Sequence, residues 1–223
     1  MSDSSFEESL QRFLEELKDE DEMTEKQRNI LRASIKLFAT KGFHATSTSE
    51  IAKEANVAEG TIFRHYKSKK DILIASVAPL IIKFAAPLVL KDVRRIFSLS
   101  EDKPFEELVQ DLIRNRMELV ESNINHARIL LQEVFFHEEI REAMMRVVLK
   151  QGKEIVTQVV ERKIERGEIR PFPPDVIFRV IFSQIIGLII HRYAIAPDLF
   201  AEQGRERQIE MTVDILMNGL RAN

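Results

Sequence analysis

Apolar residues recur at helical spacing along most of the chain. Near the N-terminal end, Ile30, Ala33, Leu37 and Phe38 follow one another at intervals that place them on one face of a helix. Glycine and proline occur only 7 times each among 223 residues, so few positions suit turns. The pattern predicts an all-α fold.

Capping signals mark where the first helices begin. Thr24 is followed by Gln27, and Ser47 by Glu50, each at the spacing of a capping box. A third short helix is predicted from Glu59 to His65. A short helix, a tight turn and a second short helix form the DNA-binding helix-turn-helix, whose second helix enters the major groove.

Two residues between these helices tolerate backbone that most residues avoid. Gly42 is expected to close the first helix as a left-handed C-cap. Asn56 stands where the chain must turn sharply between the second and third helices, and asparagine adopts the left-handed conformation more readily than most residues.

The charge distribution divides the chain into three parts. The total of 33 basic and 36 acidic residues gives a net charge of -3, which by itself argues against a nucleic-acid binder. By segment, however, the net charge is -7 over residues 1–23, +5 over 24–71 and -1 over 72–223. We therefore expect an acidic N-terminal extension, a basic helix-turn-helix domain that binds DNA, and a helical regulatory and dimerisation domain, with these boundaries.

The acidic extension allows two interpretations. Its apolar residues have helical spacing, so it is either a short helix docked on the body or a disordered arm. A disordered acidic arm would compete with DNA for the basic block.

The helix predicted from Glu59 to His65 is suited to reading DNA. Ile62 faces the small core, which leaves Thr61, Arg64 and His65 facing outward with the edge of Phe63. No acidic residue occurs from residue 60 to residue 70. Arg64 is the candidate for a bidentate contact to guanine, and a phosphate contact without base selection is the alternative.

The segment GFHATSTSEIAKEANVAEGTIFRHYKSKKDIL, residues 42–73, resembles the DNA-binding domain of the TetR family of bacterial transcriptional regulators. The resemblance covers about residues 25–73. It implies an N-terminal three-helix helix-turn-helix domain followed by a larger helical domain for ligand binding and dimerisation. Asn56 and Phe63 depart from the family pattern, which often has glycine and tyrosine there.

The resemblance also implies which residues contact double-stranded DNA. For Thr48 and Ser49, phosphate contact is also expected without the resemblance, because a helix N-terminus with free N–H groups and hydroxyls binds anions. The candidates for phosphate contact are Thr46, Thr48, Ser49, Tyr66 and Lys69, and those for the groove are Gly60, Thr61, Phe63, Arg64 and His65.

Two helices are predicted near the C-terminus, at residues 175–194 and about 205–220. The first is apolar on nearly all sides, so it must be covered by other helices. A homodimer in which the last two helices of each subunit form a four-helix bundle supplies that cover, as the family does. Such a dimer would place two heads on the half-sites of a palindromic operator.

The family resemblance implies a pocket for a small-molecule inducer in the larger domain, and the aromatic and methionine residues favour an apolar or amphipathic ligand. A cluster of such residues is, however, more often plain core than pocket wall. The candidate wall residues are Phe84, Met117, Phe135, Phe136, Met144, Met145 and Phe178, and the candidate polar contacts are Arg116, Gln132, Gln184 and His191.

Several other chemistries find no support in the sequence. Cysteine is absent, which removes thiol nucleophiles, thiolate metal sites and disulfides. Glu133 and His137 could face one metal ion, but no third ligand stands in register, so we expect no metal, no other cofactor and no enzymatic activity. The N-terminus lacks the features of a signal peptide, and the longest apolar stretch, residues 180–190, is short of the roughly 20 residues that span a membrane. The sequence thus predicts a cytoplasmic repressor released by a small ligand, or alternatively an adaptor or activator controlled by a protein partner.

Overall fold

The computed structural model describes residues 23–89, 103–145, 151–196, 198, 202 and 204–220. Their secondary structure is helical, apart from a single bridge residue at Ile169, which confirms the predicted all-α fold. Two compact units share the chain. The head unit comprises residues 1–82 and 123–146, and the body unit comprises residues 83–122 and 147–223.

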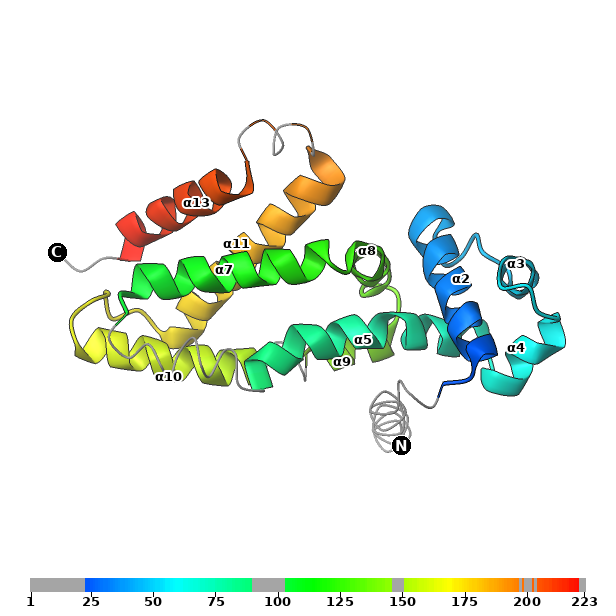
Figure 1. Cartoon of the computed structure of the whole chain (residues 1–223). Coiled ribbons are helices and arrows are strands. Elements are labelled where there is room, and N and C mark those ends of the chain that lie inside the picture. The colour runs from blue at the N-terminus through cyan, green and yellow to red at the C-terminus, as the bar shows by residue number, and fades with distance from the viewer. Residues whose placement is uncertain are drawn as a thin grey trace. The chain divides into compact units, whose positions relative to one another are not determined.

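Three helices of the head unit form the predicted helix-turn-helix (Figure 1). They are α2 (Glu25–Lys41), α3 (Thr48–Glu54) and α4 (Glu59–His65), and α2 packs against both of the others. The head also contains the first part of α5 (Lys69–Val89), together with α8 (Ile124–Glu133) and α9 (Glu138–Ala143).

Both predicted capping boxes are present. The Gln27 N–H donates to the Thr24 hydroxyl over 3.3 Å, and the Glu50 N–H donates to the Ser47 hydroxyl over 3.2 Å. In each pair the N3 side chain also accepts a hydrogen bond from the N-cap backbone. Each box therefore satisfies two backbone donors that would otherwise lack partners at a helix start.

The two turn residues adopt positive φ angles, as their types indicate. Asn56 has φ 53°, so it supplies the left-handed turn between α3 and α4. Gly42 has φ 86° but ψ 159°, which lies outside the left-handed helical region expected of it. Its N–H still bonds the Phe38 carbonyl, and the chain then leaves α2 in an extended direction.

The core of the head consists of side chains from helices far apart in the sequence. It includes Ile30, Phe38, Ile51, Ile62 and Ile72, each 0% exposed. Helix α8 packs on α2, so a segment that follows part of the body in sequence belongs to the head unit. The interleaving arises because the chain leaves the head through α5 and returns to it at α8.

The ion pair between Lys70 and Glu139 joins the start of α5 to α9. Burial is the largest single influence and would raise the pKa of Glu139. The hydrogen bond and charge of Lys70, together with a backbone hydrogen bond and the neighbouring His137, lower that pKa below its usual value.

The body unit contains α7 (Phe105–Glu121), α10 (Gln151–Glu165), α11 (Pro174–Ile190), the π-helical turn η2 (His191–Ile195) and α13 (Arg205–Leu220). Helix α7 packs against α11 and α13, and α10 packs against α11 (Figure 1). At one end, Arg205 and Arg192 each bind Glu121 over 2.8 Å. These pairs fix α13 and η2 to the last residue of α7.

Candidate DNA-binding interface

Helix α4 presents a solvent-facing surface opposite one buried anchor. Ile62 is fully buried, whereas Phe63 is 51% exposed and Gly60 and Arg64 are also exposed. Thr61 and His65 are half-buried. The face of α4 that the sequence predicts to contact the DNA groove is therefore exposed to solvent, and the half-buried Thr61 and His65 lie at its edges.

The start of α3 holds the predicted phosphate-binding hydroxyls in different environments. Ser49 is exposed, but the Thr48 hydroxyl donates a hydrogen bond to the Glu59 carboxylate over 2.6 Å. Because Glu59 is the first residue of α4, this bond connects the starts of the two helices. A phosphate that approached Thr48 would compete with a carboxylate for its hydroxyl.

The predicted phosphate ligands Thr46 and Lys69 bind the backbone of the head. Thr46 is buried, and its hydroxyl donates to the Gly42 carbonyl over 2.8 Å. The Lys69 ammonium donates to the carbonyl oxygens of Phe43 and Thr46, at 2.9 Å each, and lies 4.3 Å from the centre of the Phe43 ring. These contacts hold together the turn between α2 and α3, a role that the sequence pattern did not indicate.

Tyr66 immediately follows α4 and is 8% exposed. Its ring therefore contributes to the core of the head. Lys67, the next residue, is exposed.

The basic residues of the head differ in how far they are already neutralised. Lys41 binds Glu50 over 2.8 Å, and this hydrogen bond, with those from Ser47, lowers the pKa of Glu50 to about 2. Arg64 and Lys67, by contrast, form no ion pair with any residue that the structure describes. The end of α4 and the residue just after it therefore keep positive charge available to an external anion, as do the exposed Lys26, Arg28, Arg32 and Lys53 elsewhere in the head.

The candidate ligand residues are divided between the two units. In the body, Arg116 and Met117 are buried on α7, Phe178 stacks against Phe182 on α11, and Gln184 and His191 are exposed. In the head, Met144 is half-buried, whereas Gln132, Phe135, Phe136 and Met145 are exposed. The side chain of Phe84 lies outside the described residues.

Arg116 is the most deeply buried charge in the described part of the body. Its residue is 2% exposed, and burial lowers the pKa of its guanidinium to about 10. One nitrogen donates to the side chain of Asn115, its neighbour on α7. A buried guanidinium is a strong potential partner for an anionic group, because the low-dielectric surroundings strengthen the attraction.

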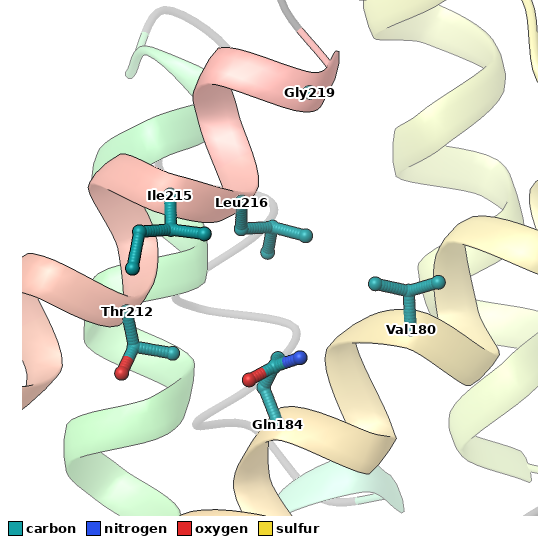
Figure 2. A pocket seen from close by; sticks show the side chains of 6 residues that line it. All are labelled: Val180, Gln184, Thr212, Ile215, Leu216 and Gly219. Carbon is teal, nitrogen blue, oxygen red and sulfur yellow. The ribbon is translucent and has the colours of Figure 1, made fainter.

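An open groove lies between α11 and α13 in the body. Figure 2 shows Val180 and Gln184 on α11 facing Thr212, Ile215 and Leu216 on α13 across it. Ile215 is 75% exposed, which is a large apolar exposure for a side chain in the middle of a helix. Gly219 also lines the groove and adds no side chain of its own.

The helical segment Pro174–Ile195 consists of α11 followed directly by η2. It is long and apolar enough to cross a membrane by length and composition alone. Its most apolar window has a mean hydropathy of 1.5, and only 28% of that window is buried within the chain. One such helix among the described residues is weak evidence for a membrane protein, because interface and core helices share these properties.

The geometry of the head defines a DNA-binding protein of the helix-turn-helix class: the short helix α3 capped by Ser47, a left-handed turn at Asn56, and the short helix α4 with an exposed face. The family model for bacterial regulatory proteins of the tetR family matches residues 30–76. Residues 30–76 therefore resemble the DNA-binding domain of this family, and the chain is a DNA-binding transcriptional regulator.

Three comparisons illustrate the relationship. The chain is similar to the uncharacterized HTH-type transcriptional regulator YvkB of Bacillus subtilis (strain 168), with 25% identity over 203 residues, or 88% of this chain and 97% of YvkB. It is 29% identical over 133 residues to the uncharacterized regulator YerO of the same strain, covering 59% of this chain and 44% of YerO, less than half of that relative.

The third comparison concerns the fold. The crystal structure of the transcriptional regulator FadR from Bacillus subtilis, in complex with stearoyl-CoA, superposes with a TM-score of 0.60 at 22% identity. The match covers 86% of this chain and 98% of FadR.

Proposed function

We propose that this chain is a cytoplasmic repressor that binds a palindromic operator as a homodimer and is released by an apolar or amphipathic small molecule. The observation that carries the proposal is the exposed face of α4. There Gly60, Phe63 and Arg64 face solvent on a helix anchored by the fully buried Ile62. A short helix of this kind presents base-contacting groups while its buried side fixes its position.

Arg64 is the residue that we assign to sequence readout. It is exposed on α4 and has no ion-pair partner among the described residues, so its guanidinium is available for a bidentate contact to guanine. Gly60 lies one turn earlier and lets the helix approach the base edges closely, because it has no side chain. Lys67 lies beyond the end of α4, where it suits a phosphate.

Operator selection from a randomised duplex pool tests this assignment. We expect an enriched palindrome whose half-sites are about 34–36 Å apart or a multiple of that distance. Arg64→Ala should lose about 1–3 kcal/mol of discrimination at one base position, whereas Lys67→Ala should weaken all sequences equally. A pool that shows no enrichment, or an Arg64→Ala loss that is uniform over all positions, would contradict base readout by Arg64.

The homodimer is supported by the exposure of the two C-terminal helices. Only 28% of the most apolar window of α11 is buried within one chain, and Ile215 of α13 is exposed beside it. A second copy packed on the α11–α13 groove would remove this apolar surface from water. The same dimer would bring two α4 helices to the two half-sites of one operator.

The ligand proposal rests on Arg116 and its surroundings in the body. A buried guanidinium beside the buried Met117 combines a site for an anion with an apolar wall, which suits an amphipathic ligand with an anionic group. The structurally similar FadR was crystallised in complex with stearoyl-CoA, a ligand of that chemical class. Binding of such a ligand to a conformation with a different head spacing would release the operator.

Stearoyl-CoA is therefore the first probe to use. We expect it to raise the Tm and lower operator affinity in the same preparation, by about 5- to 150-fold if the coupling is of ordinary size. Arg116→Met should weaken both effects, and Lys153→Met, an exposed change in the body, should weaken neither. A library of amphipathic anions that produces neither effect would favour control by a protein partner.

A further inference from the structure

Three potential metal ligands come together in the head unit. His44 lies in the turn between α2 and α3, Glu133 is the last residue of α8, and His137 immediately precedes α9. One ligand atom from each lies within 4.8 Å of the other two. The sequence indicated only the pair Glu133 and His137, because His44 is remote from both in the chain.

The separation of Glu133 and His137 suits a single bound ion. Glu133 Oε2 and His137 Nε2 are 3.2 Å apart. Two ligands with bonds of about 2.0–2.1 Å to one tetrahedral ion are about 3.3 Å apart. The backbone N–H of His137 donates to the backbone carbonyl of Glu133 over 3.0 Å. This bond keeps the two residues on the same side of the turn that follows α8.

The pair is buried, yet its facing atoms are not hydrogen-bonded. The side chain of Glu133 is 6% exposed and that of His137 is 12% exposed. Glu133 Oε2 and His137 Nε2 lie within ion-pair distance, but their alignment does not meet the geometry of a hydrogen bond. A buried carboxylate oxygen without a donor is costly, and a cation between the two atoms would satisfy both.

His44 completes the set from the solvent side. Its ring stacks nearly parallel to that of His137, with the planes at 17° and the centroids 6.4 Å apart. His44 is exposed, so rotation of its side chain can bring a ring nitrogen closer to the ligand atoms of Glu133 and His137. The Phe43 ring meets the His137 ring edge to face at 5.0 Å and supplies an apolar wall.

We propose that His44, Glu133 and His137 bind one divalent transition-metal ion, with Zn²⁺ as the best match. Two imidazoles and one carboxylate suit Zn²⁺ and its neighbours, whereas Mg²⁺ and Ca²⁺ prefer oxygen ligands. Three protein ligands leave a coordination position for water. The bound ion cross-links the α2–α3 turn to the α8–α9 turn.

The cross-link acts on the segment that leads into α3. The turn that contains His44 ends at Ser47, the N-cap of α3, and Lys69 already holds the carbonyl oxygens of Phe43 and Thr46. Metal binding adds a second restraint to the same turn. The head is therefore stabilised by the ion, whether or not DNA is present.

Titration of the full-length, untagged and EDTA-treated protein with Co²⁺ tests the site directly. Co²⁺ reports its coordination by visible absorption, and Zn²⁺ should displace it. We expect one Co²⁺ per chain, and a rise in Tm when Zn²⁺ is added. Neither readout involves DNA or an inducer, so the result is independent of the proposed function.

Substitutions identify the ligands. His44→Gln, at an exposed position, should weaken Co²⁺ binding at least tenfold and abolish the Zn²⁺-dependent rise in Tm, with unchanged circular dichroism. Glu133→Gln keeps the shape of a buried side chain and should weaken binding similarly. His191→Gln, an exposed histidine of the body, should leave both readouts unchanged. Failure of the unmodified protein to bind Co²⁺, or unaltered binding by both His44→Gln and Glu133→Gln, would overturn the proposal.

Discussion

The Lys69 ammonium lies 2.9 Å from the carbonyl oxygen of Phe43 and 4.3 Å from the centre of the Phe43 ring. A second bond of 2.9 Å reaches the Thr46 carbonyl. Lysine in a basic DNA-binding segment would ordinarily be assigned to phosphate. Here its ammonium is hydrogen-bonded to the backbone of the turn that leads into α3, and it connects that turn to the start of α5.

Lys69→Met should therefore lower the free energy of unfolding, by about 1.5–3 kcal/mol, since hydrogen bonds that involve a charged group contribute about that much. Urea denaturation measures the effect. Lys67→Met is the matched control: Lys67 is exposed, and its removal should change stability by no more than about 0.5 kcal/mol. Equal stability of the two variants would show that the Lys69 contacts contribute nothing to folding.

Substitutions of Ser47 and Ser49, which lie two residues apart at the start of α3, allow the effects of helix capping and of DNA contact to be measured separately. Ser47→Ala removes the N-cap of α3 and should cost about 1 kcal/mol in thermal or urea unfolding. Ser49→Ala should leave stability nearly unchanged but weaken operator binding, because Ser49 is exposed at the helix start. The opposite assignment of effects, with Ser49→Ala the less stable protein, would count against this division of roles.

Glu50 gives the head a defined acid sensitivity. Hydrogen bonds from Lys41 and Ser47 lower the pKa of Glu50 from 4.5 to about 2. A depressed pKa stabilises the folded state fully above the unfolded value, and this contribution is lost as pH falls from about 4.5 towards 2. The difference in Tm between the unmodified protein and Glu50→Gln should be largest near neutral pH and shrink across that interval.

The side chains of Lys41 and Glu50 are 50% and 41% exposed to solvent, so the difference in Tm should also be smaller in high salt. A Tm difference that is constant between neutral pH and pH 2 would show that the carboxylate charge is not responsible.

Ile215→Glu tests the dimer. It places a charge on the exposed apolar position of α13 beside the α11–α13 groove, so a second copy packed there would have to bury that charge. We expect a monomer by light scattering and a marked loss of operator affinity. Asp214→Asn, at the neighbouring exposed position that does not line the groove, should remain dimeric. A dimeric Ile215→Glu protein would place the interface elsewhere.

Local sequence determined the helix-turn-helix, because its signals act over a few residues. The capping boxes of Thr24 and Ser47, the positive φ of Asn56 and the inward Ile62 each depend on hydrogen bonds or sterics between near neighbours. The helix from Glu59 to His65 and the helix from about Arg205 to Leu220 were predicted with the bounds that the structure shows. The exposed surface of α4 follows from the same periodicity.

Tertiary structure decided which of these residues are available for binding. Thr46 and Lys69 bind backbone carbonyls, and the Thr48 hydroxyl binds Glu59, because helices and turns meet in space at those points. The approach of His44 to Glu133 and His137 has the same origin. Periodicity and capping report contacts within a helix turn, whereas these contacts depend on how α2, α3, α5 and α8 pack, which is set by long-range burial of their apolar faces.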